Sequence, residues 1–270
     1  YRNNILAITD PDHGLLRKEA KREGYRTLGV PPLVEGRFAV LSAVGIAVIG
    51  LKLTDNELLE FLEGARDYVN TTELGLDKVK SIVRLETKKK KTTEESAELK
   101  RLENELREEA RIKVNSSIGY MYGGLRSQLN LKHNKSLSFV VPFSYRLLGF
   151  LDWVIQLWNE SYGKPGVKEY TTGAIGLNPE SVVYDKDTEF VTLVNIEDTQ
   201  AQGIGSTRSA YYGASDSLLR KSNRPVFSLS LPSLDSRNPR SFGAFIIALE
   251  QAVMVQSKSK LFTKPIIYDN

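Results

Sequence analysis

A glutamine and a glutamate one helical turn apart are the residues whose spacing best suits chemistry in this chain. Gln156 and Glu160 lie in segment 150–164, which reads FLDWVIQLWNESYGK. The apolar residues of this segment recur at helical spacing, and side chains four residues apart share one stripe of a helix. Gly163 is a residue type that ends helices. The pattern suits a carboxylate that is shielded from solvent and points into a cleft. The alternative is a polar stripe that faces solvent.

Two α/β units are expected to position this helix. In the first unit, segments 4–9, 15–22 and 25–30 read as strand, helix and strand, and this alternation is typical of a parallel sheet. The second unit begins near residue 114 and alternates in the same way. Its expected elements are 116–130, 136–142, the helix that carries Glu160, 189–197, 210–220, 225–231 and 241–255.

The alternation predicts an α/β fold with a doubly wound parallel sheet in three αβα layers. Four apolar segments, each separated from the next by a helical pattern, are predicted as parallel core strands. They are residues 5–9, 137–141, 191–196 and 226–231.

The stretch between the two units has three recognisable parts. Residues 38–51 form an apolar run that is too short to span a bilayer and predicts a buried helix. Thr54 and Glu57 have the spacing of a capping box at the start of the next helix. Segment 87–111 is dense in Lys, Glu and Arg, which predicts a solvated helical arm. The alternative is a coiled segment that contacts a partner.

The composition excludes several kinds of site. The 270 residues include no cysteine and two histidines, which rules out disulfides, thiolate metal sites and a histidine-rich metal centre, and agrees with a cytoplasmic protein. The net charge is +4, but the basic run 88–91 is followed at once by acidic residues, so no nucleic-acid interface is expected. No signal peptide or membrane span is expected. Since Tyr1 is not an initiator methionine, we expect a trimmed chain or part of a longer product.

Four segments, in order, resemble the glucose-6-phosphate isomerase family. The first two are ILAITDPDHGLL at 5–16, similar to the family's "aiTdp..spL" strand and turn, and PLVEGRFAVLSAVG at 32–45, similar to its "GGR(F/Y)S…SA.G" signature. LEFLEGA at 59–65 is similar to "LL.GA", and segment 150–164 is similar to "QL..ES.GK". The resemblance extends over most of the chain, although loosely after Lys164.

The resemblance implies tandem domains of the sugar-isomerase type. On that comparison, residues 1–50 are the end of a first domain, 51–113 a helical connector with a charged arm, and 114–270 a second domain. The family's phosphate-binding loop would lie upstream of Tyr1, which implies a missing N-terminal segment. The resemblance also implies a cytoplasmic homodimer that shares site residues across subunits and works in glycolysis and gluconeogenesis.

For the site, the resemblance implies aldose–ketose isomerisation without cofactor or metal. Glu160 would be the base that moves a proton between C2 and C1 of glucose-6-phosphate and fructose-6-phosphate, and Arg37 would stabilise the enediolate oxygen. Gly36 would let the backbone approach the substrate. Gln156 would recognise a hydroxyl group, with a hydrogen bond to the neighbouring backbone as its alternative.

The chain also departs from the family pattern. Glu180 occupies the position where the family's ring-opening histidine is expected, and Lys264 occupies the position of a glutamine in the family's C-terminal motif. Both residues are predicted to bind substrate. Glu35 replaces a glycine of the signature, Ala39 replaces a serine, and the family's catalytic lysine would fall beyond residue 270. Two alternatives to an isomerase therefore stay open: a protein that binds sugar phosphate without turnover, and an interaction protein that presents segment 87–111 to a partner.

Overall fold

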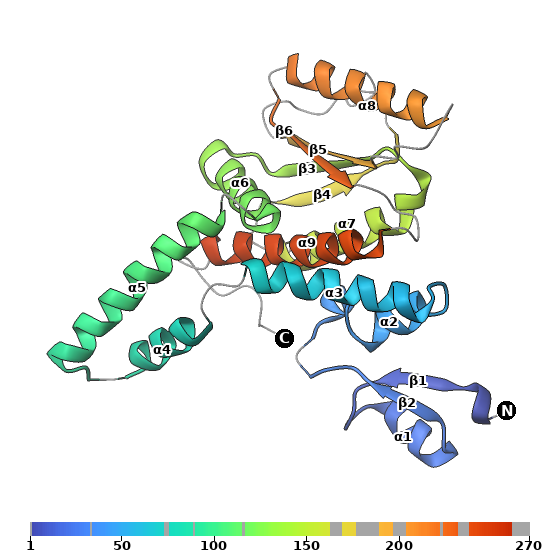
Figure 1. The fold of residues 1–270 in the computed structure, drawn as a ribbon, viewed down its shortest axis with the longest axis horizontal. Helices are drawn as coiled ribbons and strands as arrows, with labels where there is room; N and C mark the ends of the chain where they lie inside the picture. Colours follow the sequence, from blue (N-terminus) through green and yellow to red (C-terminus); the bar gives the residue numbers. More distant parts are fainter. Residues whose placement is uncertain are drawn as a thin grey trace.

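The computed structural model shows two parallel β-sheets joined and covered by helices (Figure 1). It describes residues 2–32, 34–72, 76–88, 90–114, 117–162, 169–176, 189–196, 204–221, 224–231 and 238–260. Among these residues, no helix has the length and apolarity that crossing a membrane requires.

The larger sheet has four parallel strands in the order β4-β3-β5-β6. They are β3 (Leu137–Pro142), β4 (Tyr170–Gly173), β5 (Glu189–Ile196) and β6 (Val226–Leu231). In the central pair, Val140 lies opposite Thr192. The three predicted core strands of this unit are therefore parallel neighbours, as expected. β4 was missed, because its sequence YTTG lacks the apolar pattern of a buried strand.

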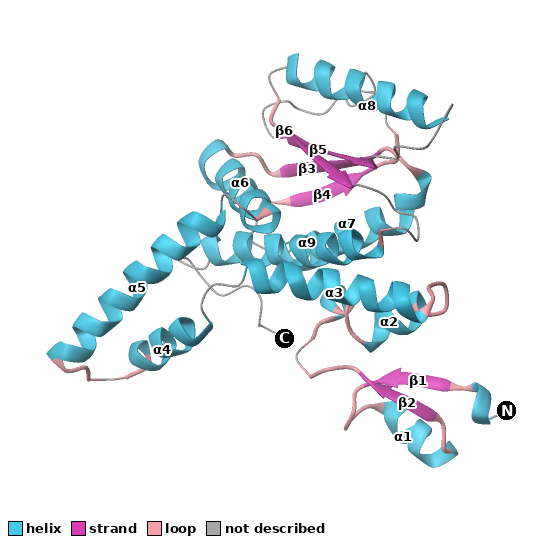
Figure 2. Cartoon of the chain, viewed as in Figure 1, coloured by secondary structure: helices cyan, strands magenta, loops and turns pink. Residues whose placement is uncertain are grey.

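Helices cover both faces of this sheet, which makes three layers (Figure 2). α8 (Ile204–Lys221) lies on one face. The other face carries α6 (Ile118–His133), α7 (Leu148–Tyr162), which follows the 3₁₀ turn η3 (Tyr145–Leu147), and α9 (Pro239–Lys260). The predicted α/β class with a parallel, helix-covered sheet is thus confirmed, although α8 begins six residues before the expected 210.

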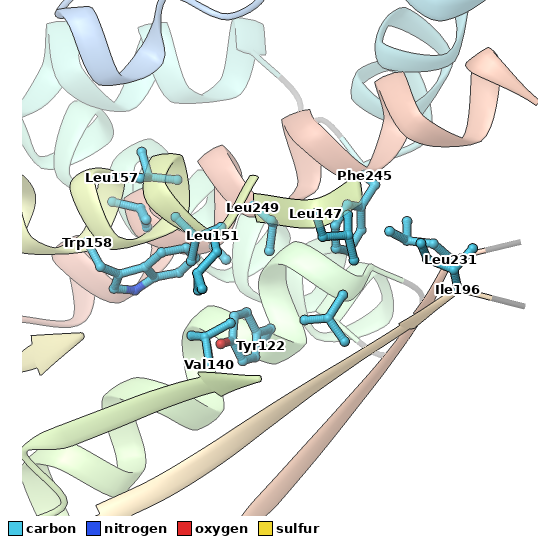
Figure 3. Close-up of a cluster of buried hydrophobic side chains, with 14 of the residues drawn as sticks. Tyr122, Val140, Leu147, Leu151, Leu157, Trp158, Ile196, Leu231, Phe245 and Leu249 are labelled. Carbon is cyan, nitrogen blue, oxygen red and sulfur yellow. The ribbon is translucent and has the colours of Figure 1, made fainter. Parts of the chain in front are cut away.

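Side chains that alternate along the strands form a separate apolar core on each face of the sheet. Phe139, Val141 and Leu193 pack with Leu219 of α8. Val140 and Val194 point the other way and pack with the helices of the opposite layer. Figure 3 shows this second core, in which α7, α9 and Tyr122 of α6 meet the sheet.

A fully buried ion pair ties the elements around this core together. Arg126 of α6 donates to a carboxylate oxygen of Glu169 at 2.9 Å, and neither side chain is appreciably exposed. The other oxygen of Glu169 accepts from Gln256 of α9, whose own amide oxygen accepts from the indole nitrogen of Trp158 at 2.9 Å. The chain of contacts therefore fixes α7 against α9 and against the start of β4.

The N-terminal unit is small. It consists of the 3₁₀ turn η1 (Arg2–Asn4), β1 (Leu6–Thr9), α1 (Leu15–Glu23) and β2 (Arg26–Gly29). β1 and β2 pair in parallel, as predicted, but in a separate two-stranded sheet. The prediction that 5–9 is a core strand is wrong for the described structure, because Ala7 is the only buried residue of β1.

The predicted buried helix at 38–51 is also wrong. The apolar run contains part of the 3₁₀ turn η2 (Gly36–Phe38) and the short helix α2 (Ala43–Ile49). Ser42 caps α2, and none of the helix's side chains is buried. Val48 is 63% exposed. Val44 and Val48 of α2 are therefore exposed, and the other residues of this helix are only partly buried.

α3 (Asp55–Thr72) begins at the predicted capping box and packs along α9. The two helices approach closely at a pair of glycines. A Cβ placed on Gly64 would lie 1.8 Å from the backbone oxygen of Arg240, and one placed on Gly243 would lie 1.9 Å from the backbone oxygen of Phe61. Only glycine permits this separation of the helices. The division of the chain into domains at residues 50 and 113 stays a prediction. α3 belongs to the predicted connector, and it packs on α9 in the helical layer of the larger sheet.

The charged segment is half of a helical hairpin formed by α4 (Leu76–Glu86) and α5 (Thr93–Val114). Figure 1 shows the hairpin extending away from both sheets. Lys78 of α4 lies 3.6 Å from Glu105 and 3.4 Å from Glu109 of α5. These half-exposed ion pairs are typical of a solvated arm, which agrees with the sequence-based expectation.

Candidate active site

The end of α7 carries the predicted base. Leu157 and Trp158 are buried in the core, which fixes the rotation of the helix. That rotation leaves Gln156 and Glu160 together on another face, where the Gln156 amide nitrogen donates to Oε1 of Glu160 at 2.9 Å. The amide nitrogen of Gln156 therefore bonds to a side chain and not to the neighbouring backbone, which was the alternative role expected for it.

Arg37 reaches the same place from η2. The indole nitrogen of Trp153 on α7 donates to the backbone oxygen of Arg37 at 2.9 Å. Nε of Arg37 donates to the hydroxyl oxygen of Ser161 at 2.9 Å. The Arg37 side chain is only 10% exposed, so α7 holds both the backbone and the guanidinium of this loop.

The guanidinium lies between two carboxylates. Nη1 of Arg37 is 3.6 Å from Oε2 of Glu160, and the same nitrogen forms a close ion pair with Glu35. Arg37, Gln156 and Glu160 are thus brought together from segments far apart in the sequence. With one cation and two carboxylates, this cluster carries a formal charge of −1 when all three groups are ionised.

The expectation of a dry carboxylate is wrong in this structure. The Glu160 side chain is 49% exposed, whereas Leu157 and Trp158, two to three residues before it, are buried. The cause is helical geometry, since the apolar stripe that faces the core lies on a different side of α7 from the Gln156–Glu160 stripe. Solvent and small molecules can therefore reach the carboxylate directly.

The remaining predicted site residues divide into two groups. At Gly36 an added Cβ would meet no atom within 4 Å, so there is open space beside the backbone next to Arg37. Glu180 and Lys264 lie outside the described residues. Within the described ranges, His, Cys, Asp and Glu side chains do not gather in any group of three or more that suits a metal ion.

Three contributors to this cluster were missed by sequence reasoning. Glu35 was noted only as a departure from a motif, yet its carboxylate contacts Arg37. Ser161 follows Glu160 in the quoted "ES" pair, so the motif itself contained a signal for it. Trp153 lies within the quoted segment 150–164, but its role as a donor to the backbone oxygen of Arg37 depends on a long-range contact that no local pattern reveals.

A strongly perturbed carboxyl group lies elsewhere, on α9. Glu250 is 6% exposed, and its Oε1 atom is buried without a hydrogen-bond partner in the described structure. Burial raises the pKa of Glu250 to about 8, because the charged form loses its hydration. The group is therefore protonated in the folded chain at neutral pH.

Comparison with known proteins finds several curated relatives that share one name. No family model matches the chain. Proteins named glucose-6-phosphate isomerase match it from Acetivibrio thermocellus (30% identity over 59% of this chain and 27% of that protein), from Parabacteroides distasonis (26% over 77% and 39%) and from Caldanaerobacter subterraneus (29% over 73% and 36%). In these matches the chain spans between a quarter and two fifths of the relatives' length.

Solved structures show the same fold at low identity. A hypothetical protein from Thermus thermophilus matches with a TM-score of 0.67 and 21% identity over 96% of this chain and 58% of that one. A glucose-6-phosphate isomerase from Chlamydia trachomatis matches with a TM-score of 0.62 and 17% identity over 93% of this chain and 47% of that one. The resemblance stated from the sequence is therefore confirmed, as a divergent and partial one.

Proposed function

We propose that this chain forms part of an enzyme that interconverts glucose-6-phosphate and fructose-6-phosphate. The observation that carries the proposal is the 3.6 Å contact between Arg37 and Glu160, which come from the two segments most similar to the isomerase motifs. The names of the curated relatives support the reaction class. On this proposal the protein works in the cytoplasm, in glycolysis and gluconeogenesis, as a homodimer.

In the proposed mechanism, Glu160 removes the proton from C2 of the open-chain sugar and returns it to C1. Gln156 holds Oε1 of the carboxylate, which fixes the carboxylate plane and leaves Oε2 to meet the proton. Arg37 supplies positive charge beside this oxygen and stabilises the enediolate as it forms. Ser161 and Trp153 fix the position of Arg37, so little reorganisation is needed during the reaction.

Binding of a sugar phosphate without turnover is the second candidate, and Glu35 is the observation that favours it. This carboxylate occupies the position of a signature glycine and pairs with Arg37, so it competes with a developing enediolate for the guanidinium. A scaffold role, in which the α4–α5 hairpin contacts a partner, is the remaining alternative.

The test is a coupled assay of fructose-6-phosphate consumption by the complete protein. Glu160→Gln keeps the size and hydrogen bonding of the side chain but removes the proton acceptor, so turnover should fall by about 10²–10⁴-fold, while sugar-phosphate binding changes little. Arg37→Ala should also slow turnover, because it removes charge stabilisation. Asp152→Asn is the matched control, since Asp152 is an exposed carboxylate on the same helix.

The outcomes separate the candidates. Full activity in Glu160→Gln would remove Glu160 from the mechanism. An inert wild-type protein that still binds fructose-6-phosphate in calorimetry would support binding without turnover. An inert protein that binds no sugar phosphate would leave the scaffold role.

A further inference from the structure

A cavity of about 570 Å³ lies between four segments that are distant in the sequence. Its walls come from α2 and the turn after it, from Phe61 of α3, from the η3–α7 corner, and from the first two turns of α9. Sites for small molecules typically measure roughly 300–1,000 Å³ and are mostly apolar, with few polar groups. Arg37, Gln156 and Glu160 do not line this cavity, so it is a second site beside the candidate active site, and Trp153 borders both.

The lining is apolar apart from a few polar side chains. Val48, Phe150 and Phe242 are representative of the walls. The charged lining residues among those described are Lys52 and Arg146, and both are cations. Both residues are exposed, and within the described ranges neither side chain forms a hydrogen bond or ion pair. The cavity therefore combines an apolar interior with uncompensated positive charge.

We propose that this cavity binds a medium-chain carboxylate, with the hydrocarbon tail between α2, α7 and α9 and the carboxylate at Lys52 and Arg146. The charge complementarity selects an anion over a neutral or cationic amphiphile, because each cation lacks a carboxylate partner in the described structure. A tail in the cavity would also cover Val48, which is 63% exposed and would gain from leaving water.

The position in the fold supports a ligand site. The connection after β3 leads through Leu147 of η3 to Phe150 in the first turn of α7, and the connection after β6 leads to Pro239, the first residue of α9. Both connections leave the carboxyl ends of parallel strands, which is where open α/β sheets usually bind ligands. The same location explains why the walls come from several elements.

Trp153 makes binding observable. It lines the cavity, and its indole nitrogen donates to the backbone oxygen of Arg37. The chain has two tryptophans, and the other, Trp158, is buried on the side of α7 that packs into the core. A ligand tail should therefore change the emission of Trp153 and leave that of Trp158 largely unchanged, and Trp153→Phe should abolish the spectral response while calorimetry still detects binding.

The experiment is calorimetric titration of the chain with decanoate at low salt. We expect one site, with octanoate binding about 15-fold more weakly, because each methylene removed from the tail weakens binding about fourfold. Decylamine should bind more weakly than decanoate. Lys52→Ala and Arg146→Ala should each weaken decanoate binding roughly two- to fivefold, and Lys132→Ala, which changes an exposed lysine on α6, should have no effect.

A second variant tests the location without disturbing the buried core. Val48→Phe adds volume at an exposed wall of the cavity and should weaken decanoate binding at least tenfold, whereas Leu59→Phe, at an exposed position on α3 outside the cavity, should not. No decanoate binding at millimolar concentration would overturn the proposal. Equal binding of decylamine, or unchanged binding in Val48→Phe or in the Lys52→Ala/Arg146→Ala double variant, would overturn it as well. These outcomes do not depend on isomerase activity.

Discussion

Replacing Glu250 with glutamine measures how much the ionisation of a buried carboxylate destabilises this fold. The side chain is 6% exposed, and burial raises its pKa from an ordinary value of 4.5 to about 8. The folded chain therefore holds a proton that the unfolded chain releases around pH 4.5. Between these two pH values the unfolded state binds fewer protons than the folded state, so stability falls as pH rises and becomes independent of this group above about pH 8.

The magnitude follows from the two pKa values. Each pH unit between 4.5 and about 8 lowers the free energy of unfolding by about 1.4 kcal/mol, so the wild-type chain loses about 5 kcal/mol over the interval from this one group. Glutamine is similar in size and stays neutral. The Glu250→Gln chain should therefore lack this part of the pH dependence and should be more stable than wild type above pH 7.

Urea unfolding followed by circular dichroism at half-unit steps from pH 4.5 to 9 is the assay. The difference in unfolding free energy between Glu250→Gln and wild type should grow steadily with pH and level off near pH 8. Glu60→Gln, at an exposed position on α3, is the control and should follow the wild-type curve. Parallel curves for Glu250→Gln and wild type would refute the reasoning, because they would show that Glu250 ionises alike in the folded and unfolded chains.

Three further predictions concern the site, the packing and the assembly. Glu35→Gly removes the carboxylate that pairs with Arg37, so fructose-6-phosphate turnover by the complete protein should rise, and a fall in the coupled assay would assign Glu35 a positive role. Gly64→Ala forces α3 and α9 apart and should lower the free energy of unfolding in urea by about 1–3 kcal/mol. Gly213→Ala on α8, where an added Cβ has open space, is the control and should be neutral or stabilising. Equal effects of the two substitutions would disprove the close crossing of α3 and α9. Light scattering at micromolar concentration should show a dimer, and a monomer alone would contradict the expected assembly.

The sequence indicated the central strands well because their signal is local. β3 and β5 are apolar runs buried on both faces, which is the pattern of a parallel sheet between helices. The capping box at Thr54 and Glu57 was predictable for the same reason, since both partners lie within one helical turn. Features that depend on a few neighbouring residues could therefore be read directly.

Features that depend on contacts between distant segments could not be read from the sequence. Apolar content suggested that α2 is buried, but burial requires a partner surface, and the described structure places none over Val48. In the site, the Gln156–Glu160 pair was predictable from spacing, whereas the place of Arg37 beside Glu160 depends on its contacts with Trp153 and Ser161, more than 100 residues away in the sequence. The exposure of Glu160 follows from the rotation of α7, which the core on its opposite side determines.

The glycine contacts between α3 and α9 also constrain the order in which the chain can fold during synthesis. Gly64 and Gly243 are separated by about 180 residues, so at ribosomal rates α9 becomes available roughly 10–40 s after α3 has been made. During that time the face of α3 around Gly64 has no partner helix. A helix in this state is open to chaperones and proteases, and a ribosome that pauses between residues 72 and 239 would prolong that exposure.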